Sequence, residues 1–156
     1  MDFRETFLSR PIAHRGYHGK KKLENSRAAF KAAILNGFGI ELDVQGLRNG
    51  CPVVFHDYSL DRLTNKKGKL NNLTFNDLEH IFLKNGELIP TLKEVLKLVN
   101  GKVPILLEIK DPTGVFGENI GELVKKSAHL INSYKGPLAV MSFNPIVVRE
   151  LEKYSP

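Results

Sequence analysis

The sequence has 156 residues, 42% hydrophobic and 26% charged, which is typical of one globular domain with its own core. No apolar run approaches the roughly 18 residues of a membrane span and the N-terminus lacks the apolar core of a signal peptide, so we expect a cytoplasmic protein without stable membrane insertion. The single cysteine, Cys51, excludes an intrachain disulfide. The net charge of +6 indicates either a solvated basic surface or attraction of anionic substrates, and nucleic acid fits less well because no nucleic-acid motif accompanies the basic runs.

Strands and helices alternate along the predicted chain. In order, the elements are a strand over 11–15, a helix over 27–36, strands over 39–45 and 51–57, a short helical piece near 75–83, a helix over 91–100, a strand over 103–110, a helix over 117–134, a strand over 137–143 and a helix from Pro145 onward. The strands are mostly solid apolar runs, which is typical of a parallel sheet covered by helices. The sequence therefore predicts an α/β fold.

The segment 58–88 interrupts this alternation. It is polar and broken, with several Asn and Gly residues, and we expect a small insertion without a hydrophobic core of its own. The turn over 48–50, just before it, predicts a hairpin connection between the strands over 39–45 and 51–57.

Two carboxylates stand close together in the strand IELDVQ, residues 40–45. Glu41 and Asp43 are two positions apart, so their side chains share one face of the strand, about 7 Å apart. Carboxylates that approach each other in a partly dry place repel and lose hydration. The pair therefore needs a counter-charge, unless it lies on the exposed surface of an edge strand.

Polar residues fall at or near the C-terminal end of four predicted strands. They form the pairs His14 and Arg15, Glu41 and Asp43, His56 and Asp57, and Glu108 and Lys110. In parallel α/β folds ligands bind at this end of the sheet, so we expect the four pairs to converge. Simpler interpretations remain for single pairs, namely a hydrogen-bonded core histidine at His14, a turn at His56-Asp57 and a plain ion pair between Glu108 and Lys110.

The three carboxylates in this set suit a hard divalent cation. Glu41, Asp43 and Glu108 offer the oxygen ligands that Mg²⁺ and Ca²⁺ prefer, and zinc is a poorer match. Such an ion would offset the repulsion between the carboxylates. Arg15 and Lys110 are cations that a phosphate group could bridge to the metal.

The two histidines complete a plausible reaction centre. His14 and His56 can divide acid and base work near neutral pH. A metal, two cations and an acid–base pair together describe a phosphoryl-transfer site.

At these residues the sequence resembles the glycerophosphodiester phosphodiesterase family. The matching stretches appear in the order typical of the family and cover residues 11 to about 150. They are His14-Arg15-Gly16, Glu24-Asn25, ELDV over 41–44, Asn49-Gly50 followed by VVFHD over 53–57, LDRLTN over 60–65, IPTL over 89–92, LEIK over 107–110 and Ser142-Phe143. Each stretch alone is a weak signal, whereas the ordered set is specific.

The resemblance implies a TIM-type (β/α) barrel with a small insertion at about 58–88. It also implies hydrolysis of a small-molecule glycerophosphodiester to glycerol 3-phosphate and an alcohol. The residue roles that it implies are a catalytic pair, His14 and His56; ligands for Mg²⁺ or Ca²⁺, Glu41, Asp43 and Glu108; phosphate contacts, Arg15 and Lys110; and a pocket residue, Phe143.

The chain departs from the family pattern in length. A complete (β/α)₈ barrel takes about 250 residues, so 156 residues hold about five of its eight strands. We expect one incomplete phosphodiesterase domain over 1–156 that lacks the C-terminal third. The barrel is then open, or a missing C-terminal segment or a partner chain closes it. The residues over 45–47 also differ from those common in the family, which concerns a loop rather than the metal site.

Two other functions stay open. A lysophospholipase D-like phosphodiesterase of the same architecture would need an apolar lid for an acyl chain, and the polar segment 58–88 argues against one. A truncated barrel that binds metal or phosphate without turnover is the other alternative. The presence of both His14 and His56 favours catalysis.

Overall fold

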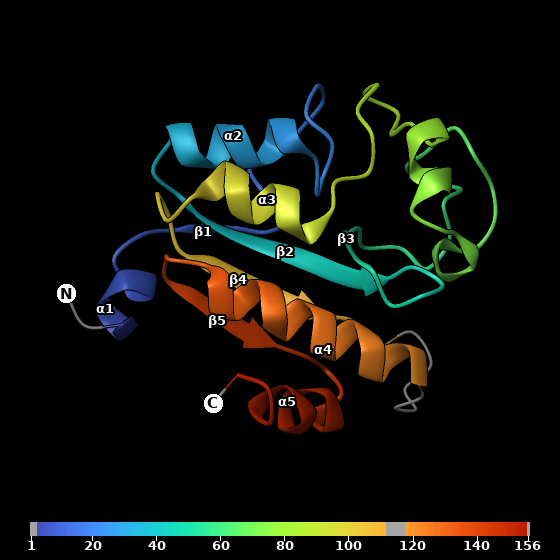
Figure 1. Ribbon diagram of the computed structural model, residues 1–156. Coiled ribbons are helices and arrows are strands. Elements are labelled where there is room, and N and C mark those ends of the chain that lie inside the picture. Colours follow the sequence, from blue (N-terminus) through green and yellow to red (C-terminus); the bar gives the residue numbers. More distant parts are fainter. Residues whose placement is uncertain (1–2, 112–117, 156) are drawn as a thin grey trace.

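The computed structural model describes residues 3–111 and 118–155, which form a curved sheet with helices packed against one face (Figure 1). Its helices and strands are α1 (Phe3–Leu8), β1 (Ile12–Ala13), α2 (Arg27–Leu35), β2 (Gly39–Gly46), β3 (Pro52–Val54), α3 (Leu92–Val99), β4 (Ile105–Ile109), α4 (Glu118–Ser133), β5 (Leu138–Met141) and α5 (Pro145–Glu152). The predicted alternation of strands and helices is confirmed. Helix α1 was not predicted from the sequence. The predicted start of α4, residue 117, lies outside the described residues.

Four of the five strands are parallel and lie in the order β1-β2-β4-β5. The predicted hairpin is confirmed, whereas the inclusion of His56 and Asp57 among the ends of parallel strands was wrong. β3 is shorter than predicted and pairs antiparallel with the C-terminal half of β2, through the predicted hairpin. This direction matters for the site, because the chain that leaves β3 runs back beside β2, where the Phe55 N–H donates to the Asp43 carbonyl.

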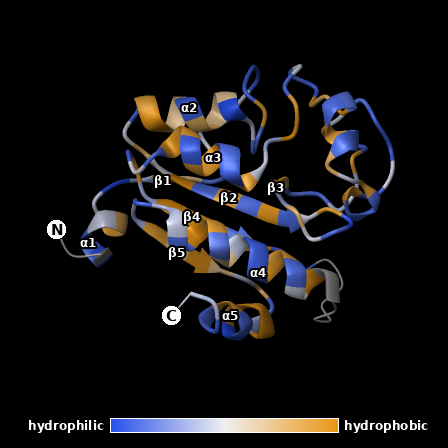
Figure 2. Ribbon diagram, viewed as in Figure 1, coloured by the Kyte–Doolittle hydropathy of each residue, from blue (hydrophilic) through white to orange (hydrophobic). Residues whose placement is uncertain are grey.

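One face of the sheet carries the main hydrophobic core. Alternate residues of β2 point to opposite faces, and Figure 2 shows the resulting alternation of hydrophobic and hydrophilic positions along this strand. Ile40, Leu42 and Val44 are fully buried under the helices together with β4 residues. Glu41, Asp43 and Gln45 point to the other face. The hydrophobic pattern thus sends the carboxylates to the concave side of the sheet.

Capping residues hold the helices that flank the site in place. Ser26 accepts a hydrogen bond from the Ala29 N–H at the start of α2. Thr91 and Glu94 form a reciprocal capping box at the start of α3. These caps satisfy N–H groups that the first helical turn leaves without partners.

The prediction that the insertion lacks a hydrophobic core was wrong. Ten buried apolar residues from it and from the neighbouring hairpin pack together, namely Leu47, Val53, Phe55, Leu60, Leu63, Leu70, Leu78, Ile81, Leu83 and Ile89. Its predicted helical piece is a short 3₁₀ helix, Asn76–His80. The apolar residues are spaced irregularly, so neither helical nor strand periodicity revealed that they cluster. The insertion is therefore a packed unit beside the end of β3.

The sheet ends at β5, which pairs with β4 alone among the described residues. All four β5 side chains are only half-buried. None of the helices in the described part of the chain is both long and apolar enough to span a bilayer.

Candidate active site

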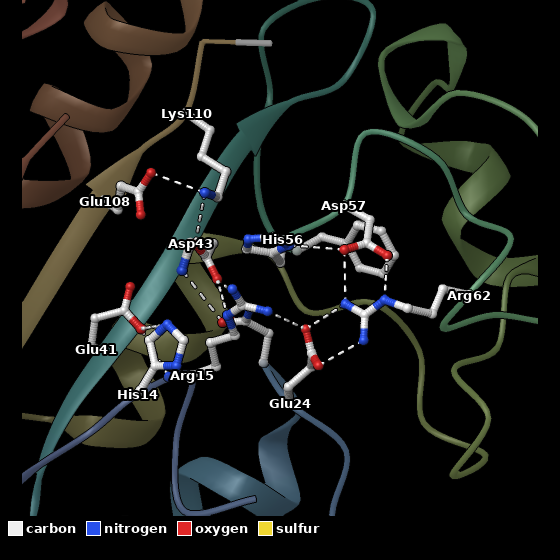
Figure 3. Close-up of polar contacts among 12 residues, drawn as sticks. His14, Arg15, Glu24, Glu41, Asp43, His56, Asp57, Arg62, Glu108 and Lys110 are labelled. Atoms are coloured by element: carbon white, nitrogen blue, oxygen red, sulfur yellow. Dashed lines mark hydrogen bonds and ion pairs between the residues drawn. The ribbon is translucent and has the colours of Figure 1, made fainter. Parts of the chain in front are cut away.

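The carboxylates of IELDVQ lie in the middle of the sheet, not at an edge. Glu41 is 5% and Asp43 1% exposed. On the neighbouring strand, Glu108 pairs in register with Asp43, so the three side chains meet on the concave face of β2 and β4 (Figure 3). One carboxylate oxygen from each residue lies within 4.8 Å of the others. The interpretation of Glu41 and Asp43 as an exposed surface pair was therefore wrong.

Asp43 is surrounded by donors. Its Oδ2 accepts a hydrogen bond from Asn25 Nδ2 at 2.7 Å and lies 3.4 Å from Arg15 Nε, and its Oδ1 lies 3.2 Å from Lys110 Nζ. Lys110 Nζ also donates to Glu108 Oε1 at 2.9 Å. The predicted Glu108–Lys110 ion pair thus exists, but it forms part of the larger cluster. Burial lowers the pKa of Lys110, yet the two carboxylates outweigh this effect and hold it above its usual value.

Glu41 has fewer compensating partners. Its Oε2 accepts the Arg15 backbone N–H at 2.8 Å, and His14 Nε2 lies 3.9 Å away. Burial raises the pKa of Glu41 to about 7; the Arg15 N–H opposes this shift, whereas the charges of Asp43 and Glu108 add to it. The negative charge of the cluster is therefore not fully offset by protein groups.

The loop after β1 delivers His14 and Arg15 to this cluster. Arg15 and Gly16 have left-handed backbones, with φ of 57° and 81°. A Cβ at Gly16 would lie 2.9 Å from the Ala29 Cβ, so glycine lets the loop pack directly on α2. The His14 side chain is 69% exposed, so it is not the buried core histidine that was considered as an alternative. It faces solvent beside Glu41.

The loop after β3 carries the second histidine. His56 Nδ1 lies 2.8 Å from Asp57 Oδ1, and the ring is half-buried. Gln45, on the concave face of β2, places its Nε2 within 2.8–2.9 Å of the carbonyl oxygens of Phe55, His56 and Asp57. These contacts tie the loop to the strand that carries the carboxylates, so residue 45 supports the site and does not merely belong to a loop. His56, Asp57 and Lys110 line a cavity of about 340 Å³ together with Tyr58 and Ser59.

Several residues that sequence reasoning did not single out complete the site. Asn25 holds Asp43, and Glu24 receives hydrogen bonds from both Arg15 and Arg62. Arg62 also contacts Asp57 with two nitrogens. The motif stretches included these residues, but nothing in their spacing indicated that the chain brings them together.

Phe143, the predicted pocket residue, does not line an enclosed pocket among the described residues. It follows β5 at the same end of the sheet, but its side chain is 90% exposed. The ring is therefore not enclosed within the described residues. The other seven predicted site residues converge at one end of the sheet, as Figure 3 shows.

The carboxylate cluster fits a hard divalent cation. Its donor atoms are all oxygens, they are buried, and they come within ligand-sharing distance of one another. Three carboxylates face two cations, Arg15 and Lys110, and burial together with the charges of Asp43 and Glu108 raises the pKa of Glu41 to about 7. A divalent cation would supply the missing positive charge, and the donor set does not distinguish Mg²⁺ from Ca²⁺.

The comparisons with known proteins agree on one family. The model of the "Glycerophosphoryl diester phosphodiesterase family" matches residues 14–156. The chain is 37% identical over 154 residues to a glycerophosphodiester phosphodiesterase from Caldanaerobacter subterraneus subsp. tengcongensis, covering 93% of this chain and 62% of the relative. It is 34% identical over 143 residues to a rat lysophospholipase D, covering 81% and 45%.

Solved structures agree with the sequence matches. A phosphodiesterase from Oleispira antarctica, in complex with the product sn-glycerol-3-phosphate, superposes with a TM-score of 0.82 at 28% identity, over 92% of this chain and 61% of that one. The predicted fold class, an incomplete TIM-type α/β barrel, is confirmed, although only four of the five strands are parallel. This chain thus spans less than two thirds of the length of these relatives.

Proposed function

The chain belongs to the glycerophosphoryl diester phosphodiesterase family, and from this premise we propose that it hydrolyses glycerophosphodiesters to glycerol 3-phosphate and an alcohol. The observation that carries the proposal is the buried Glu41–Asp43–Glu108 cluster, flanked by two cations and two histidines at one end of the sheet. The sn-glycerol-3-phosphate bound to the Oleispira antarctica relative supports this product class.

In this proposal Glu41, Asp43 and Glu108 hold Mg²⁺ or Ca²⁺. The ion would supply positive charge that polarises a phosphoryl oxygen. Burial of these carboxylates on β2 and β4 keeps them away from water and close together, so they are preorganised before any ligand arrives. Asn25 keeps Asp43 oriented by a hydrogen bond to its Oδ2.

Arg15 and Lys110 bind the phosphate in this scheme. Both now contact carboxylates, and both side chains lie at the mouth of the cluster, 19% and 11% exposed. A phosphate group that enters there would receive charge-assisted hydrogen bonds from both residues. These bonds offset the charge that develops on the phosphoryl oxygens.

His14 and His56 act as the acid–base pair. The contact between Asp57 and His56 Nδ1 leaves the Nε2 of His56 available to substrate. His14 stands on the opposite side of the cluster, beside Glu41. One ring takes a proton from the attacking hydroxyl or water, and the other gives a proton to the leaving alcohol. Each such group typically contributes about 10²–10⁴-fold in rate.

A lysophospholipase D-like activity is the second candidate. The insertion is polar in sequence, but it exposes the aromatic rings of Tyr58, Phe75 and Phe82, and Tyr58 lines the cavity beside His56. The rat lysophospholipase D is one of the relatives that this chain resembles. Release of choline from lysophosphatidylcholine, measured beside release from glycerophosphocholine, separates the two substrate classes.

We also propose that the sheet is closed by further chain or by a partner chain. Within residues 3–111 and 118–155, β5 pairs only with β4 and its side chains are half-buried, which supports the proposal because open edges invite pairing. We further propose that 58–88 is an insertion within a single phosphodiesterase domain. Light scattering of the purified chain tests closure: a stable monomer contradicts the need for it.

The decisive experiment is release of glycerol 3-phosphate from glycerophosphocholine by this chain, with and without added Mg²⁺ or Ca²⁺. His14→Ala and His56→Ala are the controls, and each should lower turnover at least about 100-fold. Metal-dependent release that both variants lose supports the proposal. A folded chain that binds metal but releases no product refutes it, and leaves a binding-only barrel.

A further inference from the structure

We propose that Arg62 is a positioning residue that fixes the Asp57–His56 pair and, through Glu24, links it to Arg15. The inference rests on the proposed function, because it assigns Arg62 to the same site. Arg62 comes from the insertion, whereas the catalytic and ligand residues proposed above lie at or just after the ends of strands. Figure 3 shows the Arg62 guanidinium between the carboxylates of Asp57 and Glu24.

The guanidinium makes two fork-like contacts. Toward Asp57, its Nε lies 2.7 Å from Oδ2 and its Nη2 2.7 Å from Oδ1. Toward Glu24, its Nη1 lies 2.9 Å from Oε2 and its Nη2 2.7 Å from Oε1. Paired contacts of this kind set the plane of each carboxylate as well as its position.

The orientation of Asp57 then determines the histidine. An ionised carboxylate can only accept hydrogen bonds, so neutral His56 must carry its proton on Nδ1 to bond Asp57 Oδ1. Its Nε2 then presents a lone pair. The hydrogen bonds from Arg62 are the largest cause that lowers the pKa of Asp57, to about 2, so the acceptor stays ionised. Removing Arg62 frees the carboxylate to rotate and weakens the preference for this tautomer.

Glu24 extends the network to the phosphate-binding arginine. Its Oε1 accepts both Arg62 Nη2 and, at 2.8 Å, Arg15 Nη1. Arg62 is again the largest cause that lowers the pKa of Glu24, to about 2. One shared oxygen thus couples the loop after β1 to the loop after β3. A displacement of Arg62 is therefore transmitted to both.

The same cluster is not a second metal site. Oxygen and nitrogen atoms of Glu24, His56 and Asp57 lie close enough together to hold an ion. However, the guanidinium of Arg62 already sits between the two carboxylates and pairs with both. A cation placed there would have to displace a charge that is held by four short contacts.

The small core of the insertion explains how Arg62 is held. Its neighbours Leu60 and Leu63 are buried in that core, and the Thr64 hydroxyl donates to the Leu60 carbonyl at 2.9 Å. The backbone around Arg62 is therefore anchored while its side chain, 51% exposed, reaches over to the site. The insertion thus supports His56 through Arg62 and Asp57.

The test compares Arg62→Met and Arg62→Lys with the wild type, and uses Arg149→Met, at an exposed arginine of α5, as the matched control. The first readout is independent of activity: ¹⁵N NMR reports the His56 tautomer at alkaline pH, where imidazoles are neutral. The His56 signals are assigned by their loss in His56→Gln. The second readout is kcat and KM with glycerophosphocholine.

We expect the wild type to carry the His56 proton on Nδ1 and Arg62→Met to gain the Nε2–H form. The kcat of Arg62→Met should fall about 10- to 100-fold, a fraction of the full acid–base contribution. Arg62→Lys should lie between the two, because a single ammonium cannot reproduce two forks, and Arg149→Met should match the wild type. An unchanged tautomer overturns the inference with or without activity, and so does an unchanged kcat in an active chain. A wild type that is inactive but has the Nδ1–H tautomer, lost in Arg62→Met, refutes the proposed function alone.

Discussion

Replacing Glu41 with Gln should stabilise the metal-free protein at neutral and alkaline pH. Burial, with help from Asp43 and Glu108, raises the pKa of Glu41 from 4.5 to about 7. The folded protein therefore holds this proton more tightly than the unfolded chain does, and stability falls as the pH rises from 4.5 to 7. At about 1.4 kcal/mol per pH unit, the loss reaches about 3 kcal/mol above pH 7. Glutamine removes the charge and keeps an acceptor for the Arg15 N–H.

Urea unfolding in the presence of a chelator, at about pH 4.5, 6 and 8, measures this effect. The stability gap between Glu41→Gln and the wild type should be near zero at the lowest pH and grow to about 2–3 kcal/mol at the highest. Glu79→Gln changes an exposed glutamate of the insertion and should stay within about 0.5 kcal/mol of the wild type throughout.

Adding Mg²⁺ or Ca²⁺ at the highest pH should reverse the order of the two proteins. A ligand that binds only the folded state stabilises it by mass action, and the variant lacks one of the three carboxylates. A stability gap that is the same at all three pH values refutes the reasoning, because the gap would then not come from ionisation. A wild type that no divalent cation stabilises refutes the metal assignment.

Two further changes test how the site and its nearest helix are held. Asn25→Ala should cost about 2–4 kcal/mol in urea unfolding, since it breaks hydrogen bonds to buried Asp43 and places alanine at φ of 54°. Asn25→Gly should recover about 1 kcal/mol of that loss, because glycine adopts this φ without strain. Equal losses in the two variants would mean that backbone strain does not contribute to the cost. Thr91→Ala should cost about 1 kcal/mol through loss of the α3 capping box while kcat stays unchanged, and a loss under about 0.3 kcal/mol would mean that the cap is not stabilising.

The order of strands and helices could be predicted from the sequence because it depends on local pattern. Solid apolar runs indicated buried parallel strands, and Pro145 marked a helix start that the structure confirms. Alternation in IELDVQ also sufficed to place Glu41 and Asp43 on one face. The convergence of the strand-end residues followed from the rule that parallel strands end at one edge of a sheet.

The same rule placed His56 at the site correctly, although its premise does not hold for this residue. His56 does not end a parallel strand; it reaches the site because β3 turns back antiparallel to β2. The predicted hairpin already implied the antiparallel direction, but the strand-end rule treated the segment 51–57 as a strand parallel to its neighbours.

The side chains for the proposed chemistry could be named from the amino-acid order alone, namely three carboxylates, two histidines and two cations. Which of these groups pair with one another depends on the folded arrangement. Glu24 and Arg62 lie 38 positions apart, with Asp57 between them in the chain, and the three show no common period. The core that places Arg62 joins apolar residues of irregular spacing. Contacts between residues far apart in the chain depend on packing that no local pattern encodes, and such contacts join Arg62 to Glu24 and bring Glu41 and Asp43 beside Glu108.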